Sequence, residues 1–182
     1  MKGAVLVTGG AKRIGRAIAL KLAQQGCKVA VHYRSSREEA METVRMIEMQ
    51  GGSAVCIGAD LGNISDVENL LESASEAIGS PILGIVNNAS MYIHDRLETM
   101  NPEVWANHMS VNVYAPLILT NSLSNSGGGW IVNILDYKID SPNADFLSYT
   151  ISKFALDGAT KTLARDLAPG VRINAVAPGH TL

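Results

Sequence analysis

The sequence predicts an α/β protein in which a doubly wound parallel sheet lies between two layers of helices, a three-layer αβα arrangement. Short apolar runs rich in β-branched residues alternate with longer segments in which apolar residues recur at helical spacing. The alternation runs along the whole chain, without an internal repeat, a low-complexity tract or a linker-like change of composition. Such alternation is typical of repeated strand–helix–strand units.

The elements follow one another in a regular order, each strand candidate leading into a helix candidate. The apolar runs that we expect to be strands are Ala4–Val7, Lys28–Tyr33, Ser53–Gly58, Ile82–Val86, Trp130–Leu135 and Arg172–Val176. The segments of helical period between them are Ile14–Gln25, Arg37–Gln50, Ser65–Ile78, Pro102–Ser122 and Phe146–Leu167.

The third helix candidate has the clearest end signals. Ser65 stands where an N-cap belongs, and Glu68 follows three residues later, as in a capping box. Gly79 is followed by a serine and a proline that cannot continue the helix. We therefore expect this helix to begin at Ser65 and to end before Gly79.

Length and composition limit the classes of function. A chain of 182 residues with 47% hydrophobic content is long enough for one core, so we expect a single domain over residues 1–182. A net charge of −2 without a basic block argues against nucleic acid or a membrane surface as partner, and favours a small-molecule substrate.

Targeting signals and cysteine spacing also limit the class of protein. There is no run of about 18 apolar residues and no secretory leader pattern, so we expect a cytoplasmic protein. Cys27 and Cys56 lie far apart without metal-ligand spacing, which predicts neither a disulfide framework nor a metal site; we interpret both as buried small hydrophobic residues.

A glycine-rich segment follows the first strand. It runs Thr8-Gly9-Gly10-Ala11-Lys12-Arg13-Ile14-Gly15-Arg16 and opens a helix. Glycines let a backbone approach a pyrophosphate, and the helix N-terminus supplies free N–H groups and the positive end of its dipole. This position in a strand–helix–strand unit predicts a dinucleotide site of the Rossmann type, although an ordinary strand-to-helix turn has the same composition.

The end of the second strand indicates which dinucleotide binds. An Asp or Glu there would accept hydrogen bonds from a free ribose 2′-hydroxyl, whereas Arg34 with Ser35 and Ser36 offers donors to a 2′-phosphate. Arg13 adds a second cation nearby. We therefore expect NADPH rather than NADH, with the alternative that these are solvated surface cations.

Tyr149 and Lys153 form the candidate catalytic pair. They lie four residues apart near the start of a helical segment, so both can face one cleft. An ammonium beside a phenol favours the phenolate, and we expect Lys153 to lower the pKa of Tyr149, which would pass a proton to the product of hydride transfer. Alone, this spacing is usually a surface pair.

Together these motifs resemble the short-chain dehydrogenase/reductase family over essentially the whole chain. Asp60-Leu61 is similar to the family's adenine-contacting pair, Asn87-Asn88-Ala89 to its strand end, and Pro178-Gly179 to the turn after its sixth strand. The resemblance implies that Asn112 supports a proton relay and that Lys153 also holds the nicotinamide ribose. It implies cofactor binding by Thr8, Gly9, Lys12, Arg13, Ile14, Gly15, Tyr33, Arg34, Ser35, Asp60, Leu61, Asn88, Ala89, Ser90, Lys153, Pro178 and Gly179.

Three departures from the family pattern narrow the resemblance. The middle glycine of the turn is Arg13, the glycine after Ala89 is Ser90, and the usual serine 13 residues before the tyrosine is Asp136. All three resemble pteridine reductases, and the context of Asp136 is similar to bacterial dihydromonapterin reductases. We therefore predict reduction of a pterin-like substrate, with Tyr149, Lys153, Asp136 and Asn112 as catalytic residues.

Several alternatives remain at this point. Asp136 also suits a structural carboxylate that caps the loop before the helix, and Asn112 a helix polar group satisfied by backbone. Carbonyl reduction, as of a 3-oxoacyl thioester, uses the same pair but keeps the serine. Because no helix or strand follows Pro178-Gly179, we expect the sequence to be C-terminally incomplete, and a non-catalytic NADPH sensor or subunit is the third alternative. The resemblance also implies a homodimer or homotetramer.

Overall fold

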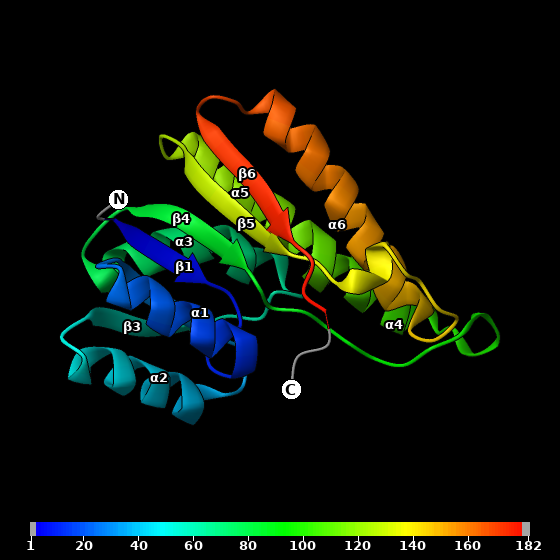
Figure 1. Ribbon diagram of the computed structural model, residues 1–182, viewed down its shortest axis with the longest axis horizontal. Coiled ribbons are helices and arrows are strands. Elements are labelled where there is room, and N and C mark those ends of the chain that lie inside the picture. The colour runs from blue at the N-terminus through cyan, green and yellow to red at the C-terminus, as the bar shows by residue number, and fades with distance from the viewer. Residues whose placement is uncertain (1–2, 180–182) are drawn as a thin grey trace.

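The computed structural model describes residues 3–179 and contains one six-stranded sheet, in the order β3-β2-β1-β4-β5-β6. Every neighbouring pair of strands is parallel. The strands are β1 (Ala4–Val7), β2 (Lys28–Tyr33), β3 (Ser53–Gly58), β4 (Ile82–Asn87), β5 (Gly129–Ile134) and β6 (Val171–Val176), as Figure 1 shows. The predicted doubly wound α/β fold is confirmed.

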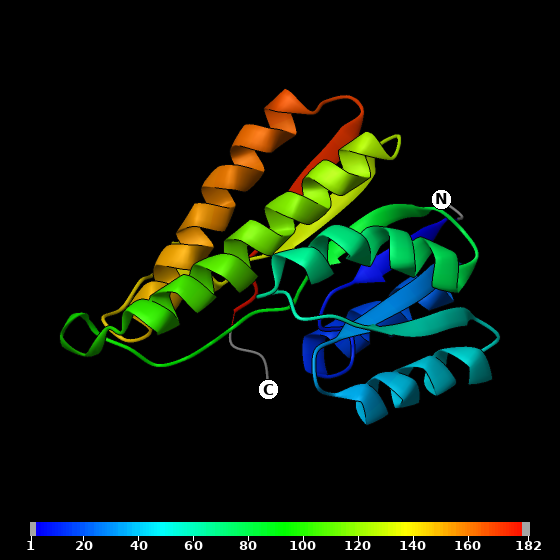
Figure 2. The same cartoon turned by 180° about the vertical axis from the view of Figure 1, so that it is seen from behind.

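Helices cover the sheet on both faces. On one face lie α1 (Arg13–Gln24) and α2 (Arg37–Met49). On the other lie α3 (Ile64–Ile78), α5 (Ala115–Asn125) and α6 (Leu147–Asp166), which stand in front of the sheet in Figure 2. The shorter α4 (Pro102–Met109) leads into α5, and single turns occur at η1 (Leu97–Thr99) and η3 (Tyr137–Ile139).

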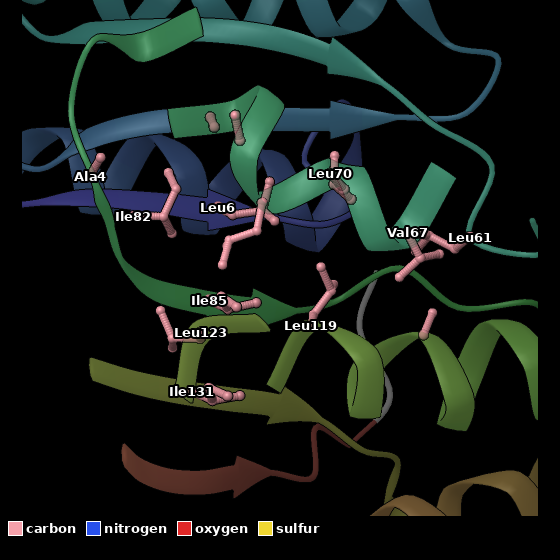
Figure 3. Packing of buried hydrophobic residues seen from close by; sticks show 14 of the residues in the cluster. Ala4, Leu6, Leu61, Val67, Leu70, Ile82, Ile85, Leu119, Leu123 and Ile131 are labelled. Carbon is pink, nitrogen blue, oxygen red and sulfur yellow. The ribbon is translucent and has the colours of Figure 1, made fainter. Parts of the chain in front are cut away.

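The core sits where the central strands meet these helices. All four residues of β1 are buried, as expected for a central parallel strand covered on both faces. On the side of α3 and α5, Leu70 and Leu119 pack against Leu6 and Ile85 of the sheet (Figure 3). The apolar runs seen in the sequence are therefore the interior strands of a packed sheet.

The observed elements agree with the predicted ones to within a few residues. The expected helix over Pro102–Ser122 is interrupted by a π-helical turn, η2 (Ser110–Tyr114), before α5 continues to Asn125. Cys27 and Cys56 are only partly buried, since both lie at the margin of the core between the sheet and α1 and α2.

The prediction that Ser65 caps α3 is wrong. Asn63 is the N-cap, and its side-chain oxygen accepts a hydrogen bond from the backbone N–H of Asp66 at 3.4 Å. Asn63 and Ser65 both belong to residue types that cap helices, so composition alone did not distinguish them. Gly79 ends the helix in the left-handed conformation, with a φ of 62°, as predicted.

The strand order places the candidate site. The chain passes from β3 at one edge of the sheet to β4, which lies beside β1 on the other side. At this reversal the loops after β1 and β4 diverge to opposite faces, leaving a crevice outside the carboxyl ends of the two strands. Among residues 3–179, no helix has the length and apolar content needed to cross a bilayer.

Replacing the cap of α3 tests the corrected boundary. Asn63→Ala removes an acceptor for a helix N–H and is expected to lower the free energy of unfolding by about 1 kcal/mol. The matched control Ser65→Ala changes an exposed side chain that does not cap the helix, and should leave stability unchanged. Urea unfolding of the three proteins measures both, and a larger loss for Ser65→Ala would contradict the assignment.

Candidate active site

A cleft of about 900 Å³ opens at the carboxyl ends of the central strands. Segments far apart in the sequence line it: the glycine-rich turn, the end of β2, the loops after β3 and β4, the loop after β5 and the start of α6. Of the residues predicted for the site, only Thr8 and Asn112 do not line the cleft. Those that do are Gly9, Lys12, Arg13, Ile14, Gly15, Tyr33, Arg34, Ser35, Asp60, Leu61, Asn88, Ala89, Ser90, Asp136, Tyr149, Lys153, Pro178 and Gly179.

The glycine turn is closely packed against the loop after β4. Gly9 has a φ of 62°, and a Cβ on Gly15 would collide with the carbonyl oxygen of Gly9. The Asn88 side chain donates to the carbonyl oxygens of Thr8 and Gly9 at 2.9 and 3.2 Å. The Thr8 hydroxyl accepts from the backbone N–H groups of Asn88 and Ala89, both at 3.0 Å. Thr8 therefore joins the two loops from beneath rather than facing the cleft.

Arg13 has a backbone conformation that favours glycine. Its φ is 49°, in the left-handed region that non-glycine residues rarely adopt. A side chain held there costs of order 1–3 kcal/mol, so the strain must be compensated by the surrounding structure. Arg13 is exposed and lines the cleft. A role in binding a ligand there would account for the strained backbone.

The cations around the turn have different roles. Lys12 forms an ion pair with Glu39 of α2, and Arg16 donates to backbone and side-chain oxygens of Ala11, Glu39 and Thr43, which fixes the turn to α2. Within the part of the chain that the structure describes, neither Arg13 nor Arg34 has an acidic partner within ion-pair distance. These two guanidinium groups are the ones available to a phosphate in the cleft.

Sequence reasoning missed His32, which lies beneath the turn and is 2% exposed. Its Nδ1 accepts from the backbone N–H of Gly9 at 3.1 Å, and its Nε2 donates to the carbonyl oxygen of Ala59 at 3.1 Å. Burial lowers the pKa of His32 to about 4, so the imidazole is neutral at pH 7. A histidine inside an apolar strand carries no signal for this role in a single sequence.

Tyr149 and Asp136 form the chemical centre of the cleft. Tyr149, at the start of α6, is 5% exposed, and its hydroxyl donates to Asp136 Oδ2 at 2.7 Å. Asp136, directly after β5, accepts at Oδ1 from the backbone N–H of Lys138 at 3.0 Å. Asp136 therefore both caps the turn after β5 and contacts the phenol.

Lys153 lies one helical turn after Tyr149 on the same face of α6. Its ammonium donates to the carbonyl oxygen of Ile134 at 2.9 Å and lies 5.6 Å from the centre of the Tyr149 ring. The side chain is 2% exposed, and burial lowers its pKa to about 8 despite the carboxylate of Asp136. The spacing of four residues thus brings both groups into one cleft, as predicted.

The pKa of Tyr149 differs from the sequence-based prediction. Burial, and then the hydrogen bond and negative charge of Asp136, raise the pKa of the phenol well above its ordinary value. We expected Lys153 to lower it. In this family pattern a serine would stand at position 136; the carboxylate there adds to the effect of burial, so that Tyr149 holds its proton firmly at neutral pH.

Asn112 lies in the π-helical turn between α4 and α5 and is 1% exposed. Its side chain accepts from the backbone N–H of Met91 at 2.7 Å and donates to the carbonyl oxygen of Met91 at 3.0 Å. It also donates to the Ser152 hydroxyl at 2.9 Å. Asn112 thus fastens the loop after β4 to α6 and does not itself line the cleft.

Aromatic rings form one wall of the cleft beside Tyr149. The rings of Tyr92 and Phe146 stack with centres 4.1 Å apart and planes 9° from parallel. Tyr92 also meets Tyr149 edge-on at 4.6 Å, and it is 54% exposed. Phe146, which sequence reasoning missed, has a φ of 60° and directly precedes α6. Met91, the residue before Tyr92, lines the cleft and also packs against the core.

A buried polar network holds this wall in place. His108 of α4 is fully buried; its Nδ1 lies 2.7 Å from the Ser148 hydroxyl, and its Nε2 accepts from the backbone N–H of Ile93 at 3.2 Å. Asp95 accepts from the Ser148 N–H at 3.1 Å. The loop that carries Tyr92 is therefore tied to both α4 and α6, next to Tyr149.

Other predicted residues lie at the expected edges. Asp60 accepts from the backbone N–H of Gly62 at 2.9 Å, which shapes the loop after β3. The carbonyl oxygen of Pro178 accepts from the N–H of Tyr137 at 3.1 Å, so the turn after β6 adjoins Asp136. Lys138 is buried beside Phe146 and donates to Asn143 at 2.7 Å. Residues 3–179 contain no cluster of three metal-ligating side chains.

Comparisons with known proteins define the class. A family model described as short chain dehydrogenase matches residues 3–182. The chain is similar to FolM alternative dihydrofolate reductase 1 from Brucella suis, a structure in complex with NADP, with a TM-score of 0.93 and 42% identity over 99% of this chain and 76% of that one.

Two relatives give the same class at lower identity. An uncharacterized oxidoreductase of Thermotoga maritima is 35% identical over 97% of this chain and 71% of its own length. The 3-oxoacyl-(acyl-carrier-protein) reductase of Synechocystis sp. is 35% identical over 96% of this chain and 72% of its own length. The protein is thus an oxidoreductase. It belongs to the short-chain dehydrogenase family, as its motifs indicated.

The shifted pKa of His32 predicts a pH dependence of stability. Its pKa is 6.5 when unfolded and about 4 when folded, so the unfolded state binds more protons between these values. The free energy of unfolding should therefore have its highest value above pH 6.5 and should fall by about 3 kcal/mol as the pH drops from 6.5 through 4.

Urea unfolding at several pH values measures this effect. Comparison with His32→Asn isolates it, because the other acidic and histidine side chains titrate alike in both proteins. Stability curves that stay parallel between pH 6.5 and pH 4 would contradict the prediction.

Proposed function

We propose that this protein is an NADPH-dependent reductase of a pterin-like substrate, one that converts a dihydropterin to a tetrahydropterin. The observation that carries the proposal is the hydrogen bond of 2.7 Å between Tyr149 and Asp136, in a cleft that also holds Lys153 and a stacked aromatic wall. The similarity to an alternative dihydrofolate reductase supports it.

The cofactor half of the cleft fits a phosphorylated dinucleotide. A Cβ on Gly15 would collide with the carbonyl oxygen of Gly9, so this glycine lets the turn pack closely against the start of α1, as in dinucleotide-binding turns. Arg34, at the end of β2, is exposed to the cleft and free of acidic partners among residues 3–179. Arg34 with Ser35 would hold the 2′-phosphate, and Asp60 and Leu61 would adjoin the adenine.

The catalytic half supplies the proton. When bound, the nicotinamide provides the hydride. Tyr149 keeps its proton at neutral pH and is the group that donates it to the reduced substrate. Asp136, which accepts the Tyr149 hydrogen bond, holds the phenol in orientation and offers an acceptor to N–H groups of the substrate. Lys153, held at Ile134, places a positive charge beneath the ring.

The substrate half fits a flat, hydrogen-bonding ring. Tyr92 exposes an aromatic face next to Tyr149 and is supported behind by Phe146. Planar rings bind well against such a face. A donor in Tyr149 and an acceptor in Asp136 side by side suit a pterin, whose C=N bonds accept hydride on carbon and a proton on nitrogen. A plain carbonyl needs only the donor.

The first prediction from this proposal concerns cofactor choice. Arg34→Ala removes a charged hydrogen bond worth about 1.5–3 kcal/mol, so the Kd for NADPH should rise roughly 10- to 100-fold while the Kd for NADH stays unchanged. Arg37→Ala is the matched control, since Arg37 is equally exposed but does not line the cleft. Tighter binding of NADH than of NADPH by the unmodified protein would refute the preference.

The second prediction concerns the substrate. NADPH oxidation is measured with a dihydropterin and, separately, with a 3-oxoacyl thioester. We expect the unmodified protein to turn over the dihydropterin. The rate of turnover should fall roughly 100-fold or more in Tyr149→Phe, which lacks the donated proton, and should fall similarly in Asp136→Ser. The dissociation constant for NADP⁺ should stay the same in both variants.

Each other result has a definite meaning. Turnover of the thioester alone would make the protein a carbonyl reductase with an unusual aspartate. Full dihydropterin turnover by Asp136→Ser would remove the role of the carboxylate, and full turnover by Tyr149→Phe would remove that of the phenol. Intact NADPH binding without any turnover would favour the non-catalytic alternative.

A further inference from the structure

His32 occupies a point where three segments of the cofactor half meet. Its Nδ1 accepts from the N–H of Gly9 in the glycine turn, and its own carbonyl oxygen accepts from the N–H of Gly10 at 2.9 Å. Its Nε2 donates to the carbonyl oxygen of Ala59, directly before Asp60. The next residues along β2 are Tyr33 and Arg34. One residue thus joins the turn after β1, the end of β2 and the loop after β3.

The two hydrogen bonds of the His32 side chain require one particular tautomer of its ring. The ring must accept at the δ position and donate at the ε position, which is the neutral imidazole protonated on Nε2. A protonated ring would donate from both nitrogens and could not accept from Gly9. The burial of the ring keeps it in the neutral form at pH 7.

The bond to Gly9 bears directly on the shape of the turn. Gly9 is in the left-handed conformation, and its N–H donates to the His32 side chain of β2. A glycine without a fixed partner samples many conformations, and ordering it on binding costs free energy. A turn held beforehand in its bound shape avoids that cost.

We propose that His32 is a positioning residue for NADP(H): through Nδ1 it holds Gly9 and the pyrophosphate turn in their bound shape, and the bond from Nε2 to Ala59 fixes the tautomer that can accept from Gly9. This proposal rests on the proposed use of a phosphorylated dinucleotide. His32 acts through Gly9 rather than by transferring a proton. Its loss therefore weakens cofactor binding without changing turnover once the cofactor is saturating.

Two substitutions separate the two bonds of the imidazole. In His32→Asn the side-chain oxygen stands near the place of Nδ1 and can accept from Gly9, but the bond to Ala59 is lost. In His32→Gln the amide reaches the place of Nε2 and can donate to Ala59, but nothing accepts from Gly9. Folding of each variant is confirmed by circular dichroism. His108→Gln is the matched control, because it changes the other buried histidine, which lies on the substrate side.

The measurements are the dissociation constant for NADP⁺ by calorimetry and the hydrogen exchange of the Gly9 amide in the protein without cofactor. Loss of one buried hydrogen bond of about 1–1.5 kcal/mol should raise the Kd of His32→Gln roughly tenfold and expose the Gly9 amide to exchange. His32→Asn should stay within about threefold of the unmodified protein and keep the amide protected. The two variants should have the same kcat at saturating NADPH.

The outcomes decide the proposal. Equal affinities for the unmodified protein and His32→Gln overturn it, as does a loss in His32→Asn as large as that in His32→Gln. An equal loss in His108→Gln also overturns it, because the effect would then come from general loosening. If the unmodified protein fails to bind NADP⁺ at all, the proposed function fails first; if it binds and the variants do not differ, only the role of His32 fails.

Discussion

All six strands run parallel, so their carboxyl ends lie along a single edge of the sheet, and the reversal of strand order between β1 and β4 opens that edge. Every chemical group of the site depends on this constraint. The glycine turn follows β1, the aromatic loop follows β4, and Asp136 follows β5. Tyr149 and Lys153 come from the helix α6, and the bond from Lys153 to the end of β5 fixes that helix to the same edge.

Within this frame the electrostatics at Tyr149 depend on burial and on the residue at position 136. Burial raises the pKa of Tyr149, and the carboxylate of Asp136 raises it further while partly offsetting the fall in the pKa of Lys153 caused by burial. A serine there could share its proton with the phenol but could not bring a negative charge. The site therefore combines a firmly held proton with an acceptor, a pairing that suits a nitrogen heterocycle better than a simple ketone.

The sequence allowed prediction of the strands, the sheet type and most residues of the cleft, because these follow from periodicity and from short motifs of fixed spacing. It did not predict the cap at Asn63, the π-helical turn around Asn112 or the stacking of Phe146 on Tyr92. Each of these depends on tertiary contacts: Asn112 bonds Met91 across the molecule, and Phe146 meets a ring from a distant loop. Likewise, the raised pKa of Tyr149 reflects burial, which spacing does not reveal.

The two histidines that sequence reasoning passed over show how the halves of the site are supported. His32 accepts a backbone hydrogen bond from Gly9 on the cofactor side, and His108 accepts one from Ile93 on the substrate side. Burial lowers the pKa of both, so each is held as the neutral ring that can accept and donate at once. Loops at the edge of a sheet lack ladder partners for their N–H groups, and a neutral imidazole beneath each loop supplies one without placing a charge in the core.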